Sequence, residues 1–206
     1  MTASPPDDVF INCPFDDAYA RTFEALIFAV TACGFRARSA RELDDGGQTR
    51  FEKLCEIIAE CRYGIHDLSR TELDAVSGLP RFNMPLELGI FLGAKRLGDA
   101  TQRLKRCLIL DVAAFRYQQF ASDLAGMDIH DHGGDARRAV VHARDWLRNA
   151  TRRKTIPGPI PLLSLYDRFM AEKPAIAAEL GFDPSQIPYL DYESMVTDWL
   201  LRTLAP

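Results

Sequence analysis

Two carboxylates of the sequence, Asp67 and Glu87, lie where acid–base or nucleophilic chemistry is often placed. Asp67 ends a short apolar run that begins at Tyr63 and is typical of a buried strand. Glu87 follows Pro85, a residue favoured at the first position of a helix, so we expect a helix with Glu87 in its first turn. In open parallel α/β sheets, ligands bind where strands end and helices begin. The sequence therefore predicts that both carboxylates border one ligand-binding crevice.

A carboxylate held at such a position could act on a glycosidic bond. The free N–H groups of a helix start favour the ionised form of Glu87, whereas a pocket that excludes water favours the protonated form. An ionised carboxylate can attack, or electrostatically support, the oxocarbenium-like carbon formed when a glycosidic C–N bond breaks. Asp67 would hold a ribose hydroxyl or share proton transfer with Glu87. The alternatives are a Glu that only complements the helix dipole and an Asp that only caps the following turn.

Polar residues near these carboxylates could orient a ribose or a phosphate. Asn12 ends the first apolar run and would border the same crevice, unless it is only a turn residue. Arg81 and Asn83 shortly precede Glu87, and Asn83 is also the expected cap of its helix. Arg50 lies near the start of an earlier helix. The turn at 44–47, which precedes it, either closes over a substrate or is a plain turn. We expect these residues to bind substrate.

The overall composition is that of an ordinary globular protein. Hydrophobic residues make up 47% and charged residues 26% of the chain, and the net charge is −4. This balance predicts no strongly basic surface, so we expect no nucleic-acid partner. No apolar run is long enough to cross a bilayer, and the N-terminus lacks the pattern of a signal peptide. We therefore expect a cytoplasmic protein without a membrane partner.

Cysteine and histidine spacing indicates neither a disulfide framework nor a metal site. The five cysteines form no C-x-x-C pair and are expected to be reduced. Cys13 ends the first strand and is an alternative nucleophile, but no His nearby in the sequence would activate it. The segment 128–132 carries two alternate His residues, yet it supplies no further placed ligand. We expect no bound metal and no cofactor.

Strands and helices are expected to alternate around these candidate residues. Apolar runs predict strands at 9–12, 35–40, 63–67, 106–111 and 127–132. A first helix, capped by Asp16, is expected to bury Phe23, Leu26, Ile27 and Val30. A second, at 51–58, is expected to bury Phe51, Leu54, Cys55 and Ile58. Further helices are expected near Pro85, over 115–124 and over 136–147. Such alternation gives a parallel sheet covered by helices on both faces. We predict a flavodoxin-like α/β fold in which the first and third strands are adjacent and flank the ligand crevice.

The chain is expected to divide into four parts. Residues 1–7 are predicted to be a disordered lead-in, 8–148 the α/β domain, 149–161 a Pro-rich basic linker and 162–206 a C-terminal helical extension. The clearest helix of the extension places one apolar face at Tyr192, Met195, Val196, Trp199 and Leu200. The extension is too small to hold a core alone, so it must dock on the main domain or on a neighbouring subunit.

Three motifs carry a resemblance to a known family. They are Val9–Phe15, Tyr63–Ser69 and Met84–Lys95, the last of which holds Glu87, Gly89 and the segment Gly93–Lys95. Together they resemble the nucleoside 2-deoxyribosyltransferase-like branch of the TIR-related superfamily. The resemblance implies that Glu87 is the nucleophile that takes the sugar, or the Glu that cleaves the nicotinamide–ribose bond in TIR-type NAD hydrolases. Phe15, at the end of the first motif, is counted among the substrate-binding residues.

The chain departs from this family just before the expected nucleophile. Transferases of the family usually place an acidic residue there to hold the base, whereas this chain has Arg81 and Asn83. Because Arg makes bidentate contacts to phosphate, the substitution favours a phosphate-bearing substrate. We expect an N-glycosidic-bond hydrolase or transferase that acts on NAD or a nucleotide and forms a homo-oligomer. The alternatives are a non-catalytic nucleotide-sensing or assembly module and an adaptor that oligomerises through the helix around Trp199.

Overall fold

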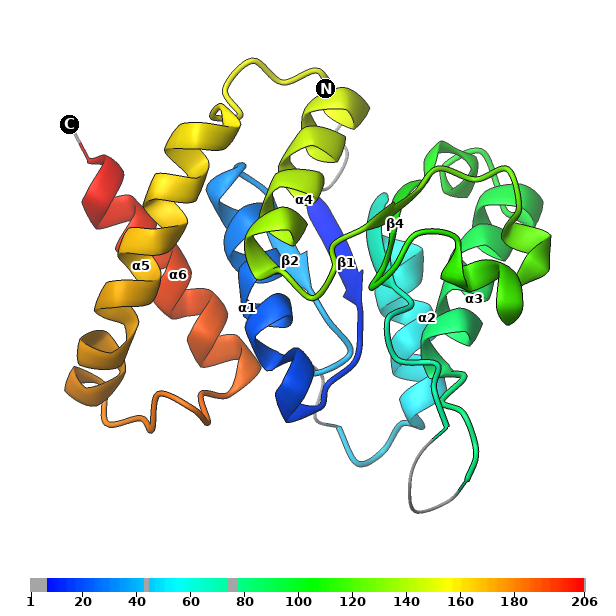
Figure 1. Cartoon of the computed structure of the whole chain (residues 1–206), viewed down its shortest axis with the longest axis horizontal. Coiled ribbons are helices and arrows are strands. Elements are labelled where there is room, and N and C mark those ends of the chain that lie inside the picture. Colours follow the sequence, from blue (N-terminus) through cyan, green and yellow to red (C-terminus); the bar gives the residue numbers. More distant parts are fainter. Residues whose placement is uncertain (1–6, 43–44, 74–77, 206) are drawn as a thin grey trace.

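Five parallel strands form a single sheet in the computed structural model, which describes residues 7–42, 45–73 and 78–205 (Figure 1). The strands are β1 (Asp8–Asn12), β2 (Arg36–Arg38), β3 (Tyr63–Asp67), β4 (Arg106–Asp111) and β5 (Ile129–Asp131). Their order is β2-β1-β3-β4-β5, so β1 is hydrogen-bonded to both β2 and β3. This order confirms the predicted flavodoxin-like α/β fold and the adjacency of the first and third strands. The predicted lead-in lies outside the described residues, except for Asp7.

Helices cover both faces of the sheet. They are α1 (Asp17–Ala32), α2 (Arg50–Glu60), α3 (Asn83–Leu97), α4 (Ala136–Thr151), α5 (Pro159–Glu179) and α6 (Tyr189–Leu204). α1 packs beside α4 on one face, and α2 packs beside α3 on the other (Figure 1). Among the described residues, no helix combines the length and the apolar character needed to cross a bilayer.

The helix predicted over 115–124 is wrong in detail. The segment instead forms two short 3₁₀ helices, η2 (Arg116–Gln119) and η3 (Ser122–Leu124), and a third, η1 (Gln102–Leu104), precedes β4. Phe115 adopts a left-handed conformation with φ of 60°, which an α-helix cannot continue through. Arg116 then turns its guanidinium back toward Asp111 and the Leu68 carbonyl, which holds the chain in this compact turn.

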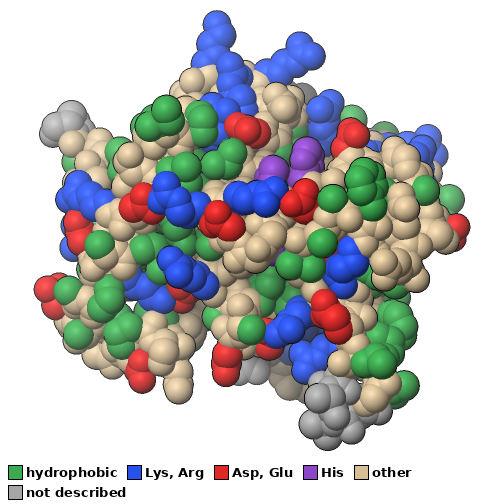
Figure 2. All heavy atoms as spheres, viewed as in Figure 1, with side chains coloured by type: hydrophobic (Ala, Val, Ile, Leu, Met, Phe, Trp, Pro, Cys, Tyr) green, Lys and Arg blue, Asp and Glu red, His purple; other side chains and the backbone are tan. Residues whose placement is uncertain are grey.

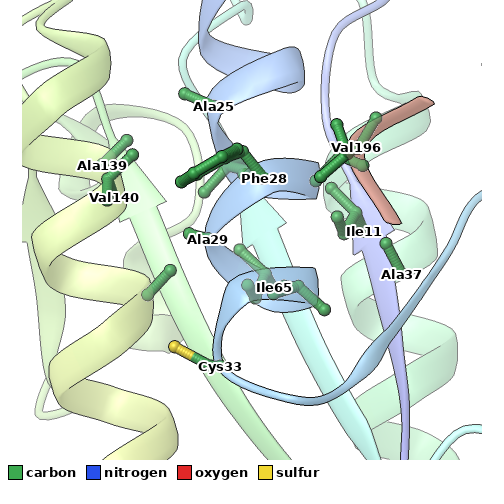
Figure 3. Packing of buried hydrophobic residues seen from close by; sticks show 14 of the residues in the cluster. Ile11, Ala25, Phe28, Ala29, Cys33, Ala37, Ile65, Ala139, Val140 and Val196 are labelled. Atoms are coloured by element: carbon green, nitrogen blue, oxygen red, sulfur yellow. The ribbon is translucent and has the colours of Figure 1, made fainter. Parts of the chain in front are cut away.

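Helix α1 occupies the centre of the larger core. The Asp16 side chain accepts a hydrogen bond from the Tyr19 N–H and caps the helix, as predicted. The predicted apolar face is buried, but Ala25, Phe28 and Ala29 are buried as well. α1 is therefore enclosed on nearly all sides, with the sheet and α4 on one part of its surface and the C-terminal helices on another (Figure 3).

The C-terminal extension docks on the α/β domain rather than standing apart from it. The Phe28 ring of α1 lies 5.4 Å from the Phe169 ring of α5 and 6.3 Å from the Trp199 ring of α6. Lys173 Nζ lies 2.5 Å from a Glu24 oxygen, which joins α5 to α1 by an ion pair that is largely buried. The apolar face around Trp199 is thus packed inside the chain, so it is not free to serve as the assembly surface that the adaptor alternative requires.

Two predicted details of the outer elements differ from the structure. The connection between α4 and α5 spans only 152–158, because both helices extend into the expected linker at 149–161. Phe51 was expected on the buried face of α2 but is 54% exposed. It is the second residue of α2, in the first turn of the helix.

Removal of the Phe169 side chain tests whether the extension shares the core of the domain. We expect Phe169→Ala to lower the free energy of unfolding by about 3–5 kcal/mol, the usual cost of such a cavity in a core. Ile160→Ala on the same helix is the control, since Ile160 is 78% exposed and should change stability by less than about 0.5 kcal/mol. Urea denaturation measures both. Equal, small effects would contradict the shared core.

Candidate functional site

Asp67, at the carboxyl end of β3, is fully buried and fully hydrogen-bonded. One carboxylate oxygen accepts from the Tyr19 hydroxyl at 2.5 Å and lies 2.9 Å from His132 Nε2, and the other accepts from the Ser69 N–H at 2.8 Å. Burial alone would raise the pKa of Asp67, but these hydrogen bonds, led by the one from His132, lower it below its ordinary value. Asp67 is therefore an ionised carboxylate that anchors three segments of the chain.

The hydrogen bonds of His132 fix its tautomer and exclude one familiar arrangement. Nδ1 accepts from the Gly134 N–H at 3.0 Å, so the ring proton lies on Nε2 and points toward Asp67. Ser69 Oγ lies 2.9 Å from the same Nε2 atom. In a nucleophilic Ser-His-Asp triad, the Ser and the Asp contact opposite ring nitrogens. Asp67, His132 and Ser69 thus form a structural network rather than a triad.

Asn12, at the end of β1, holds the start of α3. Its side-chain amide donates to the Met84 carbonyl at 2.9 Å and contacts His66 Nδ1 at 3.0 Å. His66 is fully buried on β3, and burial, aided by the charge of Lys105, lowers its pKa to about 3. His66 is accordingly a neutral core residue. The amide of Asn12 positions the helix that carries Glu87, and only 1% of the residue is exposed.

The start of α3 differs from the prediction. The helix begins at Asn83, its cap is Phe82, and no side chain caps it. Pro85 is therefore the third helical residue rather than the first, and Glu87 is the fifth and lies beyond the first turn. A Pro is tolerated there because the N–H groups of a first turn have no partner within the helix. Asn83 is exposed at the helix start, and Arg81 is exposed just before it.

Glu87 points into the protein and is only 6% exposed. Among the described residues, no hydrogen bond or ion pair reaches its carboxylate. Burial raises the pKa of Glu87 to about 7, and the positive charge of Arg50 opposes this shift only in part. The helix dipole does not hold Glu87 ionised, as it would in a first turn. The carboxyl group of Glu87 therefore gains or loses its proton near neutral pH.

Arg50 and Cys13 are the charged and nucleophilic neighbours of Glu87. Arg50 is the first residue of α2, whose cap, Thr49, forms a reciprocal pair of hydrogen bonds with Glu52. Cys13 is buried directly after β1. Burial, together with the negative charges of Asp67 and Glu87, raises the pKa of its thiol well above the ordinary value. The thiol therefore stays protonated, which argues against Cys13 as the nucleophile.

A cavity of about 470 Å³ lies next to this edge of the sheet, between the β1–α1 loop and the start of α6. Phe15, expected to bind substrate, forms part of its wall, and the Arg41 guanidinium lies 5.4 Å from the centre of the Phe15 ring. Stacked Phe23 and Tyr189 rings, 5.9 Å apart, form another part. Burial has the largest effect on the pKa of the Cys13 thiol and raises it, the negative charge of Glu87 raises it further, and the positive charge of Arg41 lowers it. Glu87 does not itself line the cavity.

The structure brings some of the predicted residues together and separates others. The charge of Arg50 acts on Glu87, and the charges of Glu87 and Asp67 both act on Cys13 directly after β1. Phe15, by contrast, lines the cavity beside this edge of the sheet. Asp44 of the 44–47 turn lies outside the described residues. Sequence analysis missed Tyr19, His132 and Arg41. His132 stood within a recognised His-rich segment, but its partner Asp67 is too distant in sequence to be inferred.

The described part of the chain contains no cluster suited to a metal ion. No group of three or more His, Cys, Asp or Glu side chains in 7–42, 45–73 and 78–205 could hold one. His130 in β5 and His132 just after it lie in different surroundings, since His130 is exposed and His132 is buried against Asp67. The five cysteines are unpaired.

Comparisons with protein-family models, with curated proteins and with solved structures find no match for this chain. The resemblance described above is therefore a hypothesis that depends on the three motifs alone.

Substitution of Tyr19 tests the charged state of Asp67. We expect Tyr19→Phe to lower the free energy of unfolding by about 1.5–3 kcal/mol at pH 7, because its hydroxyl donates to a buried carboxylate. Tyr189→Phe is the matched control: its hydroxyl donates to the neutral Ala37 carbonyl at 2.7 Å and is worth about 0.5–1.5 kcal/mol. The additional cost of Tyr19→Phe over Tyr189→Phe should vanish as the pH falls through the lowered pKa of Asp67. Equal costs at all pH values would show that Asp67 is not ionised.

Glu87 should make stability fall as the pH rises. Its pKa in the folded protein, about 7, exceeds the ordinary 4.5, so the folded state holds the proton more tightly than the unfolded state. The contribution of Glu87 to the free energy of unfolding is complete below pH 4.5 and is lost by pH 7–8. The total loss is about 3 kcal/mol. We expect Glu87→Gln to remove this slope, so that the difference in stability between the two proteins varies with pH. Urea denaturation between pH 4.5 and 8 measures it, and parallel curves would contradict the shift.

Proposed function

We propose that the protein breaks or transfers an N-glycosidic bond of NAD or a nucleotide, with Glu87 as the carboxylate that meets the anomeric carbon. The observation that carries the proposal is a buried carboxylate without a hydrogen bond or an ion pair among the described residues. It lies at the edge where ligands bind in doubly wound folds. Burying such a group without a partner costs free energy, and costly unpaired groups gather at functional sites.

The proposed chemistry uses the environment of Glu87 directly. A substrate that carries a cationic ring, such as the nicotinamide of NAD, would stabilise the ionised carboxylate beside it. As the C–N bond breaks, its electron pair leaves with the base, and the carboxylate oxygen bonds to the sugar carbon or stabilises it as an ion pair. Water or an acceptor nucleoside then attacks the sugar carbon and releases Glu87. In a dry site this electrostatic support is stronger than in water.

The other predicted residues take distinct parts in this proposal. Arg50 and the exposed Arg81 would contact phosphates, and the exposed Asn83 would contact the ribose. The cavity beside Phe15 has room and aromatic surface for a base. Asn12 and Asp67 would be positioning residues, because their polar groups are committed to internal hydrogen bonds that fix α3 and β3.

A nucleotide-sensing module without turnover is the second candidate. One observation favours it: the oxygens of Asp67 are occupied by Tyr19, Ser69 and His132, so Asp67 is not free to exchange a proton with a substrate. A sensor would keep the crevice and the affinity for the nucleotide while lacking a proton donor for the leaving base.

Incubation of the purified protein with NAD and a panel of nucleosides separates the two candidates. We expect the wild-type chain to release the free base, and Glu87→Gln to lower the rate by about 100-fold or more while binding changes little. The wild-type rate should rise with pH up to about 7–8, since the ionised carboxylate is the active form. Chromatography of the released base measures the rate, and calorimetry measures binding.

Glu179→Gln, an exposed substitution on α5, is the control and should leave the rate unchanged. Binding without turnover in the wild-type chain would favour the sensor. Full turnover by Glu87→Gln would exclude Glu87 as the reactive group.

A further inference from the structure

A second hollow lies at the opposite, amino edge of the sheet. This groove, which we call the basic groove, has a volume of about 960 Å³ and runs between the starts of β3 and β4, the ends of α3 and η1, and one side of α4. Its lining side chains include Arg62, Lys95, Arg103, Lys105, Arg106 and Trp146. Because ligand sites of this fold are expected at the carboxyl edge, nothing in the proposed function accounts for the groove.

The charge of the basic groove is opposite to that of the whole protein. The chain carries a net charge of −4, yet five Lys and Arg side chains line this groove against two acidic ones, Asp128 and Asp145. Asp145 already contacts Arg144 at 2.8 Å, which further reduces the negative charge available in the groove. A concave surface lined by one sign of charge concentrates ligands of the opposite sign.

Three of the cations have no anion of their own. Among the described residues, neither a hydrogen bond nor an ion pair reaches the side chains of Arg62, Lys95 or Arg106. Arg62 Nε is buried with no partner, and its guanidinium lies 5.5 Å from the centre of the Tyr63 ring. A buried guanidinium N–H is costly to leave without an acceptor. These groups are therefore free to bind an anion.

Lys105 and Trp146 form the more rigid parts of the basic groove. Lys105 is nearly fully buried, and its ammonium donates to the Ile58 and Cys61 carbonyls at the end of α2. It contributes positive charge to the floor without being mobile. The Trp146 ring is half-buried and meets the Tyr63 ring edge-on at 6.2 Å. An indole held in this way offers a surface on which an aromatic ring can stack.

Two histidines line the same surface, of which His130 has a ring N–H that no hydrogen bond among the described residues uses. His130 and His142 line the basic groove with their ring centres 5.1 Å apart, and His142 Nε2 lies 3.0 Å from the Asp131 carbonyl. Figure 2 shows histidine side chains at the surface between α4 and β4. The N–H of His142 is donated to the Asp131 carbonyl, so only the imidazole N–H of His130 is available to a phosphate oxygen.

We infer that the basic groove binds a ligand with two or more linked phosphates, as in a nucleoside polyphosphate or an inorganic polyphosphate. A single phosphate would engage only part of a groove of this size, whereas a chain of phosphates can contact Arg62, Lys95 and Arg106 together. Guanidinium groups match phosphate geometry through paired hydrogen bonds. The inference is independent of the proposed function, because the groove and Glu87 lie at opposite edges of the sheet.

Calorimetric titration of the full chain tests this inference with four probes: ATP, tripolyphosphate, adenosine and a single-stranded RNA oligomer. We expect ATP and tripolyphosphate to bind at 50 mM salt, to bind more weakly at 500 mM salt, and adenosine not to bind. Equal affinities for ATP and tripolyphosphate would show that the phosphate chain suffices. Tighter binding of ATP would show that its base also contributes to the affinity. A change in the fluorescence of Trp146, measured in a Trp199→Phe variant, would report this contact independently.

Charge removal locates the site. We expect Arg62→Gln with Arg106→Gln to weaken ATP binding by about tenfold or more. Arg137→Gln with Arg168→Gln, two exposed arginines outside the groove, is the matched control and should change it by less than about twofold. Lys95→Gln alone provides a second test if the double variant unfolds.

Glu87→Gln should leave this affinity unchanged, which separates failure here from failure of the proposed function. The inference is overturned if neither ATP nor tripolyphosphate binds, or if the charge variants bind as the wild-type chain does. It is also overturned if RNA binds while both small phosphates do not, because the groove would then be a nucleic-acid surface.

Discussion

Three carboxylates lie buried at the carboxyl edge of the sheet, Asp67, Asp111 and Glu87, and among the described residues only Glu87 has no hydrogen-bond donor. Asp67 receives three, from Tyr19, Ser69 and His132, and these contacts join α1, the end of β3 and the segment after β5. A buried charge satisfied in this way fixes the geometry around it, whereas a buried carboxyl without donors keeps its proton near neutral pH. Glu87 is the second kind. The same edge therefore holds a rigid anchor, Asp67, and a group that titrates near neutral pH, Glu87.

The C-terminal extension contributes to this edge although it is distant in the sequence. α5 and α6 enclose α1, and the ion pair between Lys173 and Glu24 holds them there. One consequence is the cavity beside Phe15, whose wall combines the β1–α1 loop with Tyr189 at the start of α6. An α/β domain without the extension would leave this surface open. The extension thus shapes the crevice as well as completing the core.

The fold could be predicted where local pattern decides the outcome. Apolar runs located β3 and β4 to the residue, and their alternation with amphipathic helices implied the strand order. The start of α3 was misplaced because Pro85 is acceptable anywhere in a first turn, so its presence does not fix the first residue. Phe51 was misassigned because a periodic pattern shows which face of a helix is apolar but not which of its turns is packed against the rest of the protein.

The candidate site was harder to predict because it depends on contacts between distant residues. The partners of Asp67 lie 48 and 65 positions away, and nothing near Asp67 in the sequence indicates Tyr19 or His132. The burial of Glu87 likewise comes from tertiary packing, which reversed the expected effect of the helix start on its ionisation. Local sequence placed Asp67 at a strand end and Glu87 near a helix start, and only the three-dimensional arrangement distinguishes the anchor from the titrating group.

A carbon-13 NMR titration of the Glu87 side-chain carboxyl tests the central claim most directly. Glu87→Gln identifies the resonance, and the chemical shift followed from pH 4 to 9 gives the pKa in the folded protein. The account predicts a midpoint near pH 7 for this carboxyl. A midpoint near the ordinary value of 4.5 would show that the carboxylate is solvated or paired, and the proposal for Glu87 would then be wrong.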